Sequence, residues 1–386
     1  MRVLHIHSGN LYGGVETMLL ALARHTHLDS ATEHEFALSF DSRIAAELRE
    51  SDAVVHLLGE ARTRHPLSVR RARQRLRDLL ARRNFDAAIC HMSWAQAMFA
   101  PAVRASGTPL VFWMHGAAGR HWLERWARRH IPDLTICNSQ FIVTTLSKLY
   151  PRCACEILHY PLTLTPAELN YAEREQIRAQ FDTPPNAFVI IQVSRMESWK
   201  GHLLHLEALA KLRNDPGWIC WFVGGAQRPR EARYLEQLRR LAVRFGITDK
   251  VRFLDQRGDV PRLMAAADLF CQPNLGGEPF GIVFVEAMAA GLPVVTTAIG
   301  GALEVVDRSC GLLTPPGDAA ALAAALRRLI NDQEERRRLG AAGPVRARQL
   351  CDPTDRIEDL ALTLRRVTRA HKPINECAAS EAHAPS

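Results

Sequence analysis

The chain has 386 residues, a formal net charge of +8 and an apolar share of 47%. This length predicts two or three domains, and the composition is typical of a globular protein with enough apolar residues to form cores. No uninterrupted apolar run approaches the roughly 20 residues of a membrane-spanning helix, so no such helix is predicted.

The N-terminal residues and the cysteines indicate the cellular compartment of the protein. The N-terminal residues MRVLHIHSG enter a strand-like run at once and show no signal-peptide pattern. The nine cysteines are an odd number and are scattered without the spacing of a metal site. We therefore expect a reduced, cytoplasmic compartment.

Strand-like and helical segments alternate along the chain. The first half opens with a strand, the Gly-rich loop SGNLYGGVE and a helix, and further strands are predicted at 34–40, 87–93, 109–116 and 133–139. The second half repeats this order from 187 onward, with further strands at 218–225, 251–255, 269–274 and 292–301. Strands separated by helices predict parallel sheets. We expect an α/β protein of two Rossmann-like, doubly wound domains that face each other across a cleft, with ligands beyond the carboxyl ends of the strands.

The same patterns predict the domain boundaries. We expect an N-terminal domain over 1–165, a polar linker over 166–186 and a C-terminal domain over 187–352. A helix over 353–370 is predicted to return to the N-terminal domain. The tail 371–386 lacks periodicity and bulky apolar residues, so we expect it to be disordered.

Two basic segments lie in the first half. Between 62 and 83 there are nine arginines against one aspartate, and apolar residues recur there at helical spacing, which predicts an amphipathic basic helix. It is either a solvated face or a surface that binds anionic lipid headgroups. In HWLERWARRH (121–130), Trp122 and Trp126 are interpreted as core residues, with an interfacial or acceptor-binding role as the alternative. No nucleic-acid-binding module is present, so we expect no nucleic acid partner.

An acidic pair brackets an apolar helix in the second half. The segment GGEPFGIVFVEAMAAGLPVV (276–295) predicts a buried helix from Gly281 to Ala290, with Pro279 in its first turn. Glu278 lies at the helix entrance and Glu286 lies one to two turns inside. A buried carboxylate needs a cation or polar ligand, and a helix N-terminus suits phosphate. A nucleotide-sugar meets both conditions, while a capping Glu278 and a salt-bridged Glu286 are the structural alternative.

A cationic loop follows the first strand of the second half. SRMESWKG (194–201) places Arg195 and Lys200 at the carboxyl end of the strand AFVIIQV. Two cations there could hold a diphosphate and neutralise its charge as it leaves. The alternative is a surface loop with ordinary charges.

Taken in order, these segments resemble a known family. VSRMESWKGH, FVGG (222–225), VRFLDQRGDVPRLMAAADLFCQPN (251–274), the segment 276–306 and GLLTPPGD (311–318) are similar to the retaining GT-B glycosyltransferases of family four, group 1 type. The family's pair of glutamates eight residues apart is present as Glu278 and Glu286. In the first half GGVE (13–16), MHG (114–116) and CNS (137–139) agree more loosely. The resemblance covers roughly residues 1–350.

The resemblance implies a role for each matching residue. Glu278 would bind hydroxyls of the donor sugar, Glu286 the ribose, and Arg195 and Lys200 the diphosphate. Residues that would approach the sugar and the phosphates through their backbone are Phe280, Gly281, Ile282, Gly13 and Gly14. His115, at the end of a strand, would contact the transferred sugar. His5, His7, His91 and His159 have no such support and are interpreted as structural.

The activity implied is transfer of a sugar from a nucleotide-sugar donor, with retention at the anomeric carbon. We expect no cofactor and no metal, because Arg195, Lys200 and a helix end take the phosphate charge and no DxD cluster is present. The acceptor is expected to be a lipid-linked or cell-surface glycan or glycolipid precursor, with the protein cytoplasmic or peripheral on the inner face of an anionic membrane. The chain departs from the family at LHYPLTL (158–164), where an Asn-Gly pair is common, which bears on the interdomain hinge.

Three other functions remain as alternatives. A synthase with a small soluble acceptor would share the same donor site. A non-catalytic relative would bind a nucleotide-sugar without transferring it, although intact Glu278, Glu286, Arg195 and Lys200 argue against this. A nicotinamide-dependent oxidoreductase would need G-x-G-x-x-G after the first strand, and the glycine spacing in SGNLYGGVE does not match.

Overall fold

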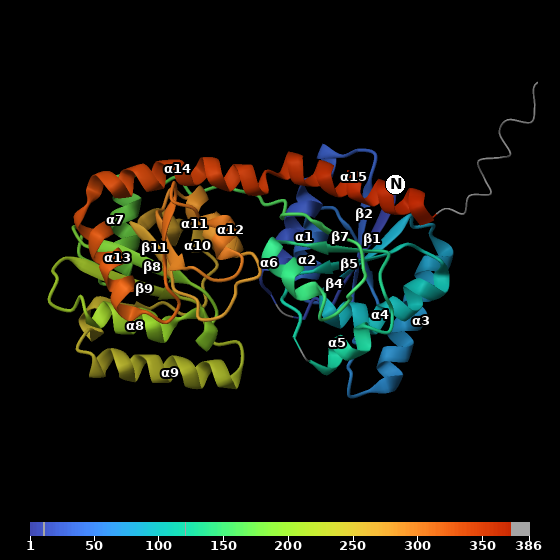
Figure 1. The fold of residues 1–386 in the computed structure, drawn as a ribbon, viewed down its shortest axis with the longest axis horizontal. Helices are drawn as coiled ribbons and strands as arrows, with labels where there is room; N and C mark the ends of the chain where they lie inside the picture. The colour runs from blue at the N-terminus through green and yellow to red at the C-terminus, as the bar shows by residue number, and fades with distance from the viewer. Residues whose placement is uncertain (11, 120, 372–386) are drawn as a thin grey trace, which may run out of the picture. The chain divides into compact units, whose positions relative to one another are not determined.

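The computed structural model describes residues 1–10, 12–119 and 121–371, and the chain divides into two compact units (Figure 1). The N-terminal unit comprises Met1–Leu162 together with the C-terminal helix that begins at Pro353. The C-terminal unit comprises Thr163–Asp352. The tail predicted to be disordered, 371–386, lies outside the described residues except for His371.

The N-terminal unit is built on a seven-stranded parallel sheet with the order β3-β2-β1-β4-β5-β6-β7. Its strands are β1 (Arg2–His7), β2 (Glu33–Leu38), β3 (Val54–Leu57), β4 (Ala87–His91), β5 (Leu110–Met114), β6 (Leu134–Cys137) and β7 (Cys155–Ile157). The five strands expected in this half are confirmed. Sequence analysis missed the two edge strands β3 and β7, which are only partly buried and too short to show a pattern.

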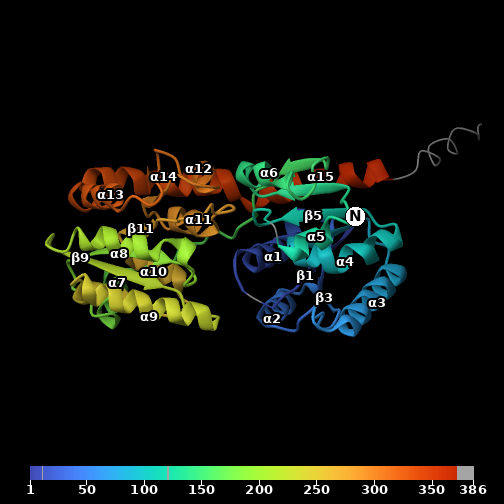
Figure 2. The same ribbon diagram turned by 60° about the horizontal axis from the view of Figure 1, so that its bottom comes forward.

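Helices cover both faces of this sheet (Figures 1 and 2). They are α1 (Gly14–Arg24), η1 (Thr26–Leu28), α2 (Arg43–Glu50), α3 (Pro66–Arg82), α4 (Met92–Ser106), α5 (Trp122–Ala127), α6 (Gln140–Leu146) and α15 (Pro353–His371). Side chains of α3 and α4 pack with the strand residues Leu4, Ile6 and Phe112 in one apolar core. Helix α15 contacts α1, η1 and β4, so it is an integral part of the N-terminal unit.

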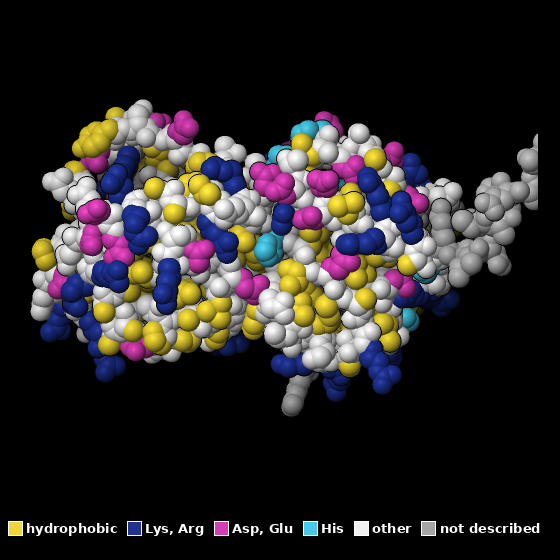
Figure 3. Space-filling model, turned by 45° about the horizontal axis from the view of Figure 1, so that its top comes forward, with side chains coloured by type: hydrophobic (Ala, Val, Ile, Leu, Met, Phe, Trp, Pro, Cys, Tyr) yellow, Lys and Arg dark blue, Asp and Glu magenta, His cyan; other side chains and the backbone are white. Residues whose placement is uncertain are grey.

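Of the predictions for the two basic segments, the structure agrees with one and contradicts the other. The predicted amphipathic helix is α3, which buries Val69, Ala72, Leu76 and Leu80 and leaves most of its arginines exposed, while Arg73 is half-buried and donates to carbonyl oxygens of α4. The interpretation of Trp122 as a core residue is wrong, because 43% of it is exposed. A six-residue helix is too short to bury both ends of its apolar stripe, and of its two tryptophans Trp126 packs against the core, together with Leu123. On the face shown in Figure 3, basic and acidic side chains are interspersed.

The C-terminal unit is built on a six-stranded parallel sheet with the order β10-β9-β8-β11-β12-β13. Its strands are β8 (Phe188–Val193), β9 (Trp218–Val223), β10 (Val251–Phe253), β11 (Leu269–Gln272), β12 (Val294–Thr297) and β13 (Gly311–Thr314). The chain reverses direction across the sheet between β8 and β11, which is the switch point where doubly wound sheets bind ligands. Both units are therefore Rossmann-like, and the predicted fold class is confirmed.

Helices flank this second sheet as well. They are α7 (Tyr171–Gln180), η2 (Ser198–Lys200), α8 (His202–Ala210), α9 (Pro229–Arg244), η3 (Thr248–Lys250), α10 (Val260–Ala266), α11 (Ile282–Ala289), α12 (Ala302–Val305), α13 (Ala319–Asn331) and α14 (Gln333–Cys351). Helix α7 lies inside the segment expected to be a linker. It begins at a capping box formed by Asn170 and Glu173, and its Arg178 reaches Asp268 at 2.8 Å.

Helix α11 is the apolar helix predicted between the two glutamates. Phe284, Val285, Ala287 and Met288 are buried, as expected for a helix that is apolar nearly all round. The helix begins after Gly281, whose φ of 96° favours glycine. Pro279 therefore precedes the helix and does not lie in its first turn, because the left-handed turn at Gly281 interrupts the path between them.

Candidate functional site

Two loops meet at the switch point of the C-terminal unit. The loop after β8 contains Lys200 in η2, and the loop after β11 contains Glu278. Gly201, with a φ of 76°, permits their approach, because a Cβ there would lie 1.7 Å from the carbonyl oxygen of Pro273. The amide of Leu275 donates to the carbonyl oxygen of Trp199 at 2.8 Å, which joins the two loops directly.

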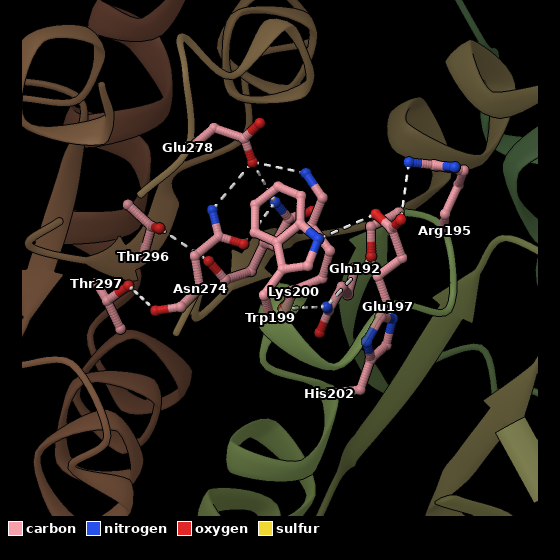
Figure 4. Close-up of polar contacts among 12 residues, drawn as sticks. Gln192, Arg195, Glu197, Trp199, Lys200, His202, Asn274, Glu278, Thr296 and Thr297 are labelled. Carbon is pink, nitrogen blue, oxygen red and sulfur yellow. Dashed lines mark hydrogen bonds and ion pairs between the residues drawn. The ribbon is translucent and has the colours of Figure 1, made fainter. Parts of the chain in front are cut away.

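Glu278 is the centre of a polar cluster between these loops. Its Oε2 accepts from Lys200 Nζ at 2.6 Å, from Asn274 Nδ2 at 3.1 Å and from Gln272 Nε2 at 3.4 Å. The residue is only 8% exposed. The other carboxylate oxygen takes no part in these three bonds and points away from the cluster (Figure 4). The network therefore leaves this second oxygen as a candidate acceptor for a ligand hydroxyl.

Lys200 is held from three sides. Its ammonium bonds to Glu278 and lies 4.0 Å from the centre of the Trp199 ring, where a cation–π interaction stabilises it. Its carbonyl oxygen accepts from Gln192 Nε2 at 2.9 Å. The side chain of Trp199 in turn donates to Glu197 at 3.1 Å. These contacts fix one cation of the predicted diphosphate site at a defined position (Figure 4).

Arg195, the second predicted cation, also has acidic partners. Its guanidinium lies 2.9 Å from Glu197 Oε1 and 3.8 Å from Glu231 Oε1. About a third of its side chain is exposed, so water screens both pairs. Each predicted phosphate-binding cation thus has a carboxylate counter-ion in the protein without ligand, and a diphosphate bound there would have to compete with these carboxylates.

Glu286 differs from Glu278 because it has no side-chain partner among the described residues. Burial of its carboxyl group raises its pKa to about 7. The sequence-based expectation that Glu286 needs a cation or a polar ligand is therefore not met inside the protein. A carboxyl group with this pKa, held without a partner, has both oxygens available for hydroxyl groups of a ligand.

The start of α11 provides backbone groups. Phe280 is buried, Gly281 is the N-cap, and Ile282 is the first helical residue. Intrahelical bonds do not use the first amides of a helix, so those at this end are directed outward and favour a negative charge. A Cβ at Gly281 would lie 2.4 Å from the Phe284 ring, which explains why glycine stands here.

The remaining predicted site residues lie in the N-terminal unit. Gly13 is the N-cap of α1 and Gly14 is its first residue, and both are exposed after the carboxyl end of β1. The same helix carries Glu16, whose carboxylate is 2.7 Å from His7 Nε2. The structure therefore presents an accessible helix N-terminus at the Gly-Gly loop, with Glu16 anchored to the strand beneath it.

His115 follows β5 and is 6% exposed. Its Nε2 is 2.9 Å from His91 Nδ1, and its Nδ1 is 2.7 Å from the hydroxyl group of Tyr160. Burial and the neighbouring His7 hold the pKa of His115 well below its usual range, so the ring is neutral at pH 7. Both ring nitrogens are engaged within the unit, which fixes the orientation of the ring.

Several residues of the site were not predicted from the sequence. Asn274 and Gln272 support Glu278, and Trp199 and Glu197 flank the two cations. The signal for the first pair was present: Gln272 ends the buried strand β11 and Asn274 follows it, so both stand at the carboxyl edge where ligands bind. Nothing in the sequence indicated that Trp199 would lie against Lys200.

Comparison with known protein families identifies the chain. The sequence model of the family described as glycosyl transferases group 1 matches residues 173–346, and that of glycosyltransferase family 4 matches residues 12–160. The chain belongs to the family 4, group 1 glycosyltransferases. Each match covers most of one Rossmann-like unit, so the resemblance that was weaker in the first half of the sequence is confirmed there too.

Curated members of this family match the chain over part of their length. A phosphatidyl-myo-inositol mannosyltransferase of Mycobacterium leprae is 48% identical over 111 residues, which is 28% of this chain and 29% of the relative. The lipopolysaccharide core biosynthesis glycosyltransferase LpsE of Rhizobium meliloti is 33% identical over 167 residues, which is 43% of this chain and 46% of the relative. The matched segments thus span less than half of each relative.

A solved GT-B structure matches nearly the whole chain. Anabaena Alr3699/HepE in complex with UDP-glucose superposes with a TM-score of 0.83 at 26% identity, covering 95% of this chain and 100% of HepE. The chain therefore shares the two-domain fold of HepE, a relative whose structure holds UDP-glucose. Among its described helices, none combines the length and apolar character that crossing a bilayer requires.

Proposed function

We propose that this glycosyltransferase moves a sugar from a nucleotide diphosphate sugar to an acceptor, with retention at the anomeric carbon. The observation that carries the proposal is the contact between Lys200 and Glu278 at the switch point of the C-terminal unit. The proposal is supported because Lys200, a cation suited to a leaving diphosphate, lies beside a carboxylate whose other oxygen faces away from its protein partners (Figure 4). The likeness to HepE, whose structure holds UDP-glucose, supports the same class of donor.

The proposed donor site divides its work between charges and backbone. Lys200 and Arg195 bind the diphosphate and stabilise its charge as the sugar bond breaks. Amides at Phe280, Gly281 and Ile282 add the partial positive charge of a helix end. Glu278 accepts bonds from sugar hydroxyls, and Glu286 accepts bonds from ribose hydroxyls.

The N-terminal unit is proposed to complete the reaction with neutral groups. Gly13 and Gly14 offer exposed backbone amides to the phosphates, and His115 contacts the transferred sugar. Because no side chain is assigned as a nucleophile, we propose displacement on one face of the sugar, in which the acceptor attacks from the side that the diphosphate leaves. Retention is measured directly by following the anomeric proton of the product by nuclear magnetic resonance.

We also propose that transfer proceeds without a divalent metal, since two fixed cations and a helix end are available for the diphosphate. Treating the purified protein with EDTA should then leave turnover within about twofold of the untreated protein. A loss that added Mg²⁺ or Mn²⁺ restores would overturn this part of the proposal.

The acceptor is proposed to be a lipid-linked or cell-surface glycan precursor. Two relatives named above act, by their names, on phosphatidyl-myo-inositol and on the lipopolysaccharide core. Helix α3 presents an arginine-rich outer face, and Trp122 of α5 is exposed in the same unit. Both features suit peripheral contact with anionic lipid.

A small soluble acceptor is the second candidate. It is favoured by a D-inositol 3-phosphate glycosyltransferase of Corynebacterium efficiens, which is 35% identical over 175 residues, 43% of this chain and 40% of the relative. Sedimentation with vesicles that contain anionic lipid separates the two candidates. Binding that is lost in high salt favours a membrane acceptor, and failure to sediment at low salt favours a soluble one.

A thermal-shift screen with UDP-, GDP- and ADP-sugars tests the donor class, beginning with UDP-glucose. A ligand at about 100 times its dissociation constant stabilises a protein by about 2.7 kcal/mol, which the measurement resolves easily. Release of the nucleoside diphosphate from the stabilising donor then tests catalysis. A protein that binds a donor but neither hydrolyses nor transfers it would be a non-catalytic relative.

A further inference from the structure

Four histidines form a continuous line through the N-terminal unit. His34 Nδ1 is 2.9 Å from His5 Nε2, His5 Nδ1 is 3.0 Å from His91 Nε2, and His91 Nδ1 is 2.9 Å from His115 Nε2. The last ring continues through its Nδ1 to the hydroxyl group of Tyr160 at 2.7 Å. We call His34, His5, His91 and His115 the histidine chain. It crosses the strands β2, β1 and β4 to the end of β5.

The histidine chain lies on one face of the sheet. Neighbouring residues Leu4, Ile6 and Cys90 belong to the apolar core formed with α3 and α4, so the alternating side chains His5 and His91 point to the opposite face. Successive rings are close, with centroids 5.1 or 5.2 Å apart. His5, His91 and His115 are stacked at angles of 20° between successive ring planes.

All four rings are neutral at pH 7. Burial lowers the pKa of His34 to about 4 and holds the pKa values of His5, His91 and His115 well below their usual range. A neutral imidazole has one N–H donor and one bare nitrogen acceptor. In an unbroken line each ring must therefore donate in the same direction, so the tautomer of one ring dictates the tautomer of the next.

The Tyr160 end of the line favours one direction. Asn138 Nδ2 donates to the Tyr160 hydroxyl oxygen at 2.6 Å, and the phenol hydrogen then suits donation to His115 Nδ1. His115 in that case carries its hydrogen on Nε2 and donates to His91. The same direction continues through His5 to His34, so that every ring has its hydrogen on Nε2.

We propose that His91, His5 and His34 are positioning residues that hold His115 in a single tautomer and a single orientation through this directional line of hydrogen bonds. The expected effect of this line on sugar transfer rests on the proposed function of His115. The coupling between the tautomers of the four rings does not depend on that function. His34, three strands away from His115, thereby influences a group that it does not touch.

Burial of the four imidazoles costs free energy that burial of apolar side chains would not. The imidazole nitrogens that bond to one another inside the line are removed from water, and one left without its partner loses hydrogen bonds that water would have supplied. A merely space-filling role would be served by apolar side chains of similar size, such as Phe36, which stacks on His5 at 5.2 Å. The four imidazoles therefore set the direction of the hydrogen bonds in addition to filling space.

The test is the tautomer of His115 in the full-length protein labelled with ¹⁵N-histidine. Protonated and bare imidazole nitrogens have well-separated ¹⁵N shifts, and single substitutions assign the four rings. In the wild type we expect all four rings in the Nε2–H form at pH 7. His5→Phe keeps a stacked ring but breaks the line, and should change the tautomer ratio at His115 by about fivefold, the factor that one typical hydrogen bond contributes.

Two further variants serve as comparisons. His5→Gln keeps one donor and one acceptor and should stay closer to the wild type than His5→Phe does. Val3→Ala removes buried apolar volume from the same strand and face but leaves every imidazole in place, and should destabilise the protein without changing the His115 tautomer. Turnover with UDP-glucose should fall about fivefold in His5→Phe, and in Val3→Ala it should stay within twofold.

Mixed tautomers along the line in the wild type, or an unchanged His115 signal in His5→Phe, would overturn the proposal. A uniform line in either direction that responds to His5→Phe supports it. If the line responds but no donor is ever turned over, the proposed function fails while the coupling of the four tautomers stands.

Discussion

The two Rossmann-like units place polar groups at the same point of the same topology and satisfy them in different ways. In the C-terminal unit the switch point between β8 and β11 holds an ion pair, Lys200 with Glu278, braced by side-chain amides. In the N-terminal unit the corresponding edge, between β1 and β4, holds neutral imidazoles that bond to one another. The fold determines where a site lies, and the loops and strand ends determine its charge.

This difference fits a division of labour within the enzyme. In the proposed reaction a leaving diphosphate needs fixed positive charge, which Lys200 and Arg195 of the C-terminal unit would supply. In the same proposal the uncharged sugar meets neutral groups of the N-terminal unit, among them the ring of His115, whose orientation is fixed because both of its nitrogens are already bonded. The following predictions test the comparison, beginning with the largest expected effect.

Lys200→Ala should lower kcat/KM for the donor by on the order of 10²-fold or more, because it removes a preorganised cation from the diphosphate and leaves Glu278 without its ion-pair partner. Steady-state release of the nucleoside diphosphate measures the change. Lys211→Ala, at an exposed lysine of the same unit, is the matched control and should stay within about twofold. Equal activity of the two variants would show that Lys200 does not act in the donor site.

Glu286→Gln should stabilise the protein without ligand at high pH. Because burial raises the folded-state pKa of Glu286 from 4.5 to about 7, folding takes up a proton between these values, and stability falls as pH rises through this window. The variant lacks the titrating group and should exceed the wild type by on the order of 3 kcal/mol above pH 7.

Denaturant unfolding at pH 5, 6, 7 and 8 measures this difference, which should vanish below about pH 4.5. The same substitution should weaken binding of UDP at pH 8, since an ionised carboxylate is the stronger acceptor for ribose hydroxyls. If the difference in stability between the wild type and Glu286→Gln does not change with pH, the carboxyl group of Glu286 is solvated.

The two glycine positions should respond differently to alanine. Gly281→Ala should destabilise the protein by about 1–3 kcal/mol, because its φ of 96° is strained for alanine and a Cβ would lie 2.4 Å from the Phe284 ring. Gly13 has an extended φ of −172°, and among the described residues only Glu16 Oε2 would lie within 4 Å of a Cβ there, so Gly13→Ala should barely change the melting temperature. A loss of donor affinity in Gly13→Ala then reports on ligand approach and not on folding.

Glu278→Gln separates binding of the sugar from binding of the diphosphate. It frees Lys200 from its counter-ion, so affinity for UDP should be maintained or increase, while the preference for UDP-glucose over UDP should fall about tenfold. Isothermal titration with both ligands measures the ratio. Equal weakening of the two ligands would mean that Glu278 supports the loop and does not contact the sugar.

Prediction from the sequence succeeded where the signal is local. Period-2 and helical patterns located ten strands and the buried helix α11, and loop positions after β8 and β11 located Lys200 and Glu278 at one edge of a sheet. It failed for β3, β7 and β13, which are short strands at or near the sheet edges with few buried residues. The helix α7 was missed in a segment that looked like a linker, although its capping box of Asn170 and Glu173 is a local signal. Its contact with the sheet through Arg178 and Asp268 joins residues that are far apart in sequence and could not be predicted.

By itself, the sequence determined the fold class, the family and the residue types at the donor site, because hydrophobic period, turn residues and motif spacing are properties of neighbouring residues. Only the tertiary structure decided that Lys200 is paired with Glu278 and that Glu286 has no side-chain partner in the described part of the chain. It also decided that His34, His5, His91 and His115 form one line. The physical reason is that hydrogen bonds and burial depend on which strands become neighbours, and β1 lies between β2 and β4 only after the sheet has formed.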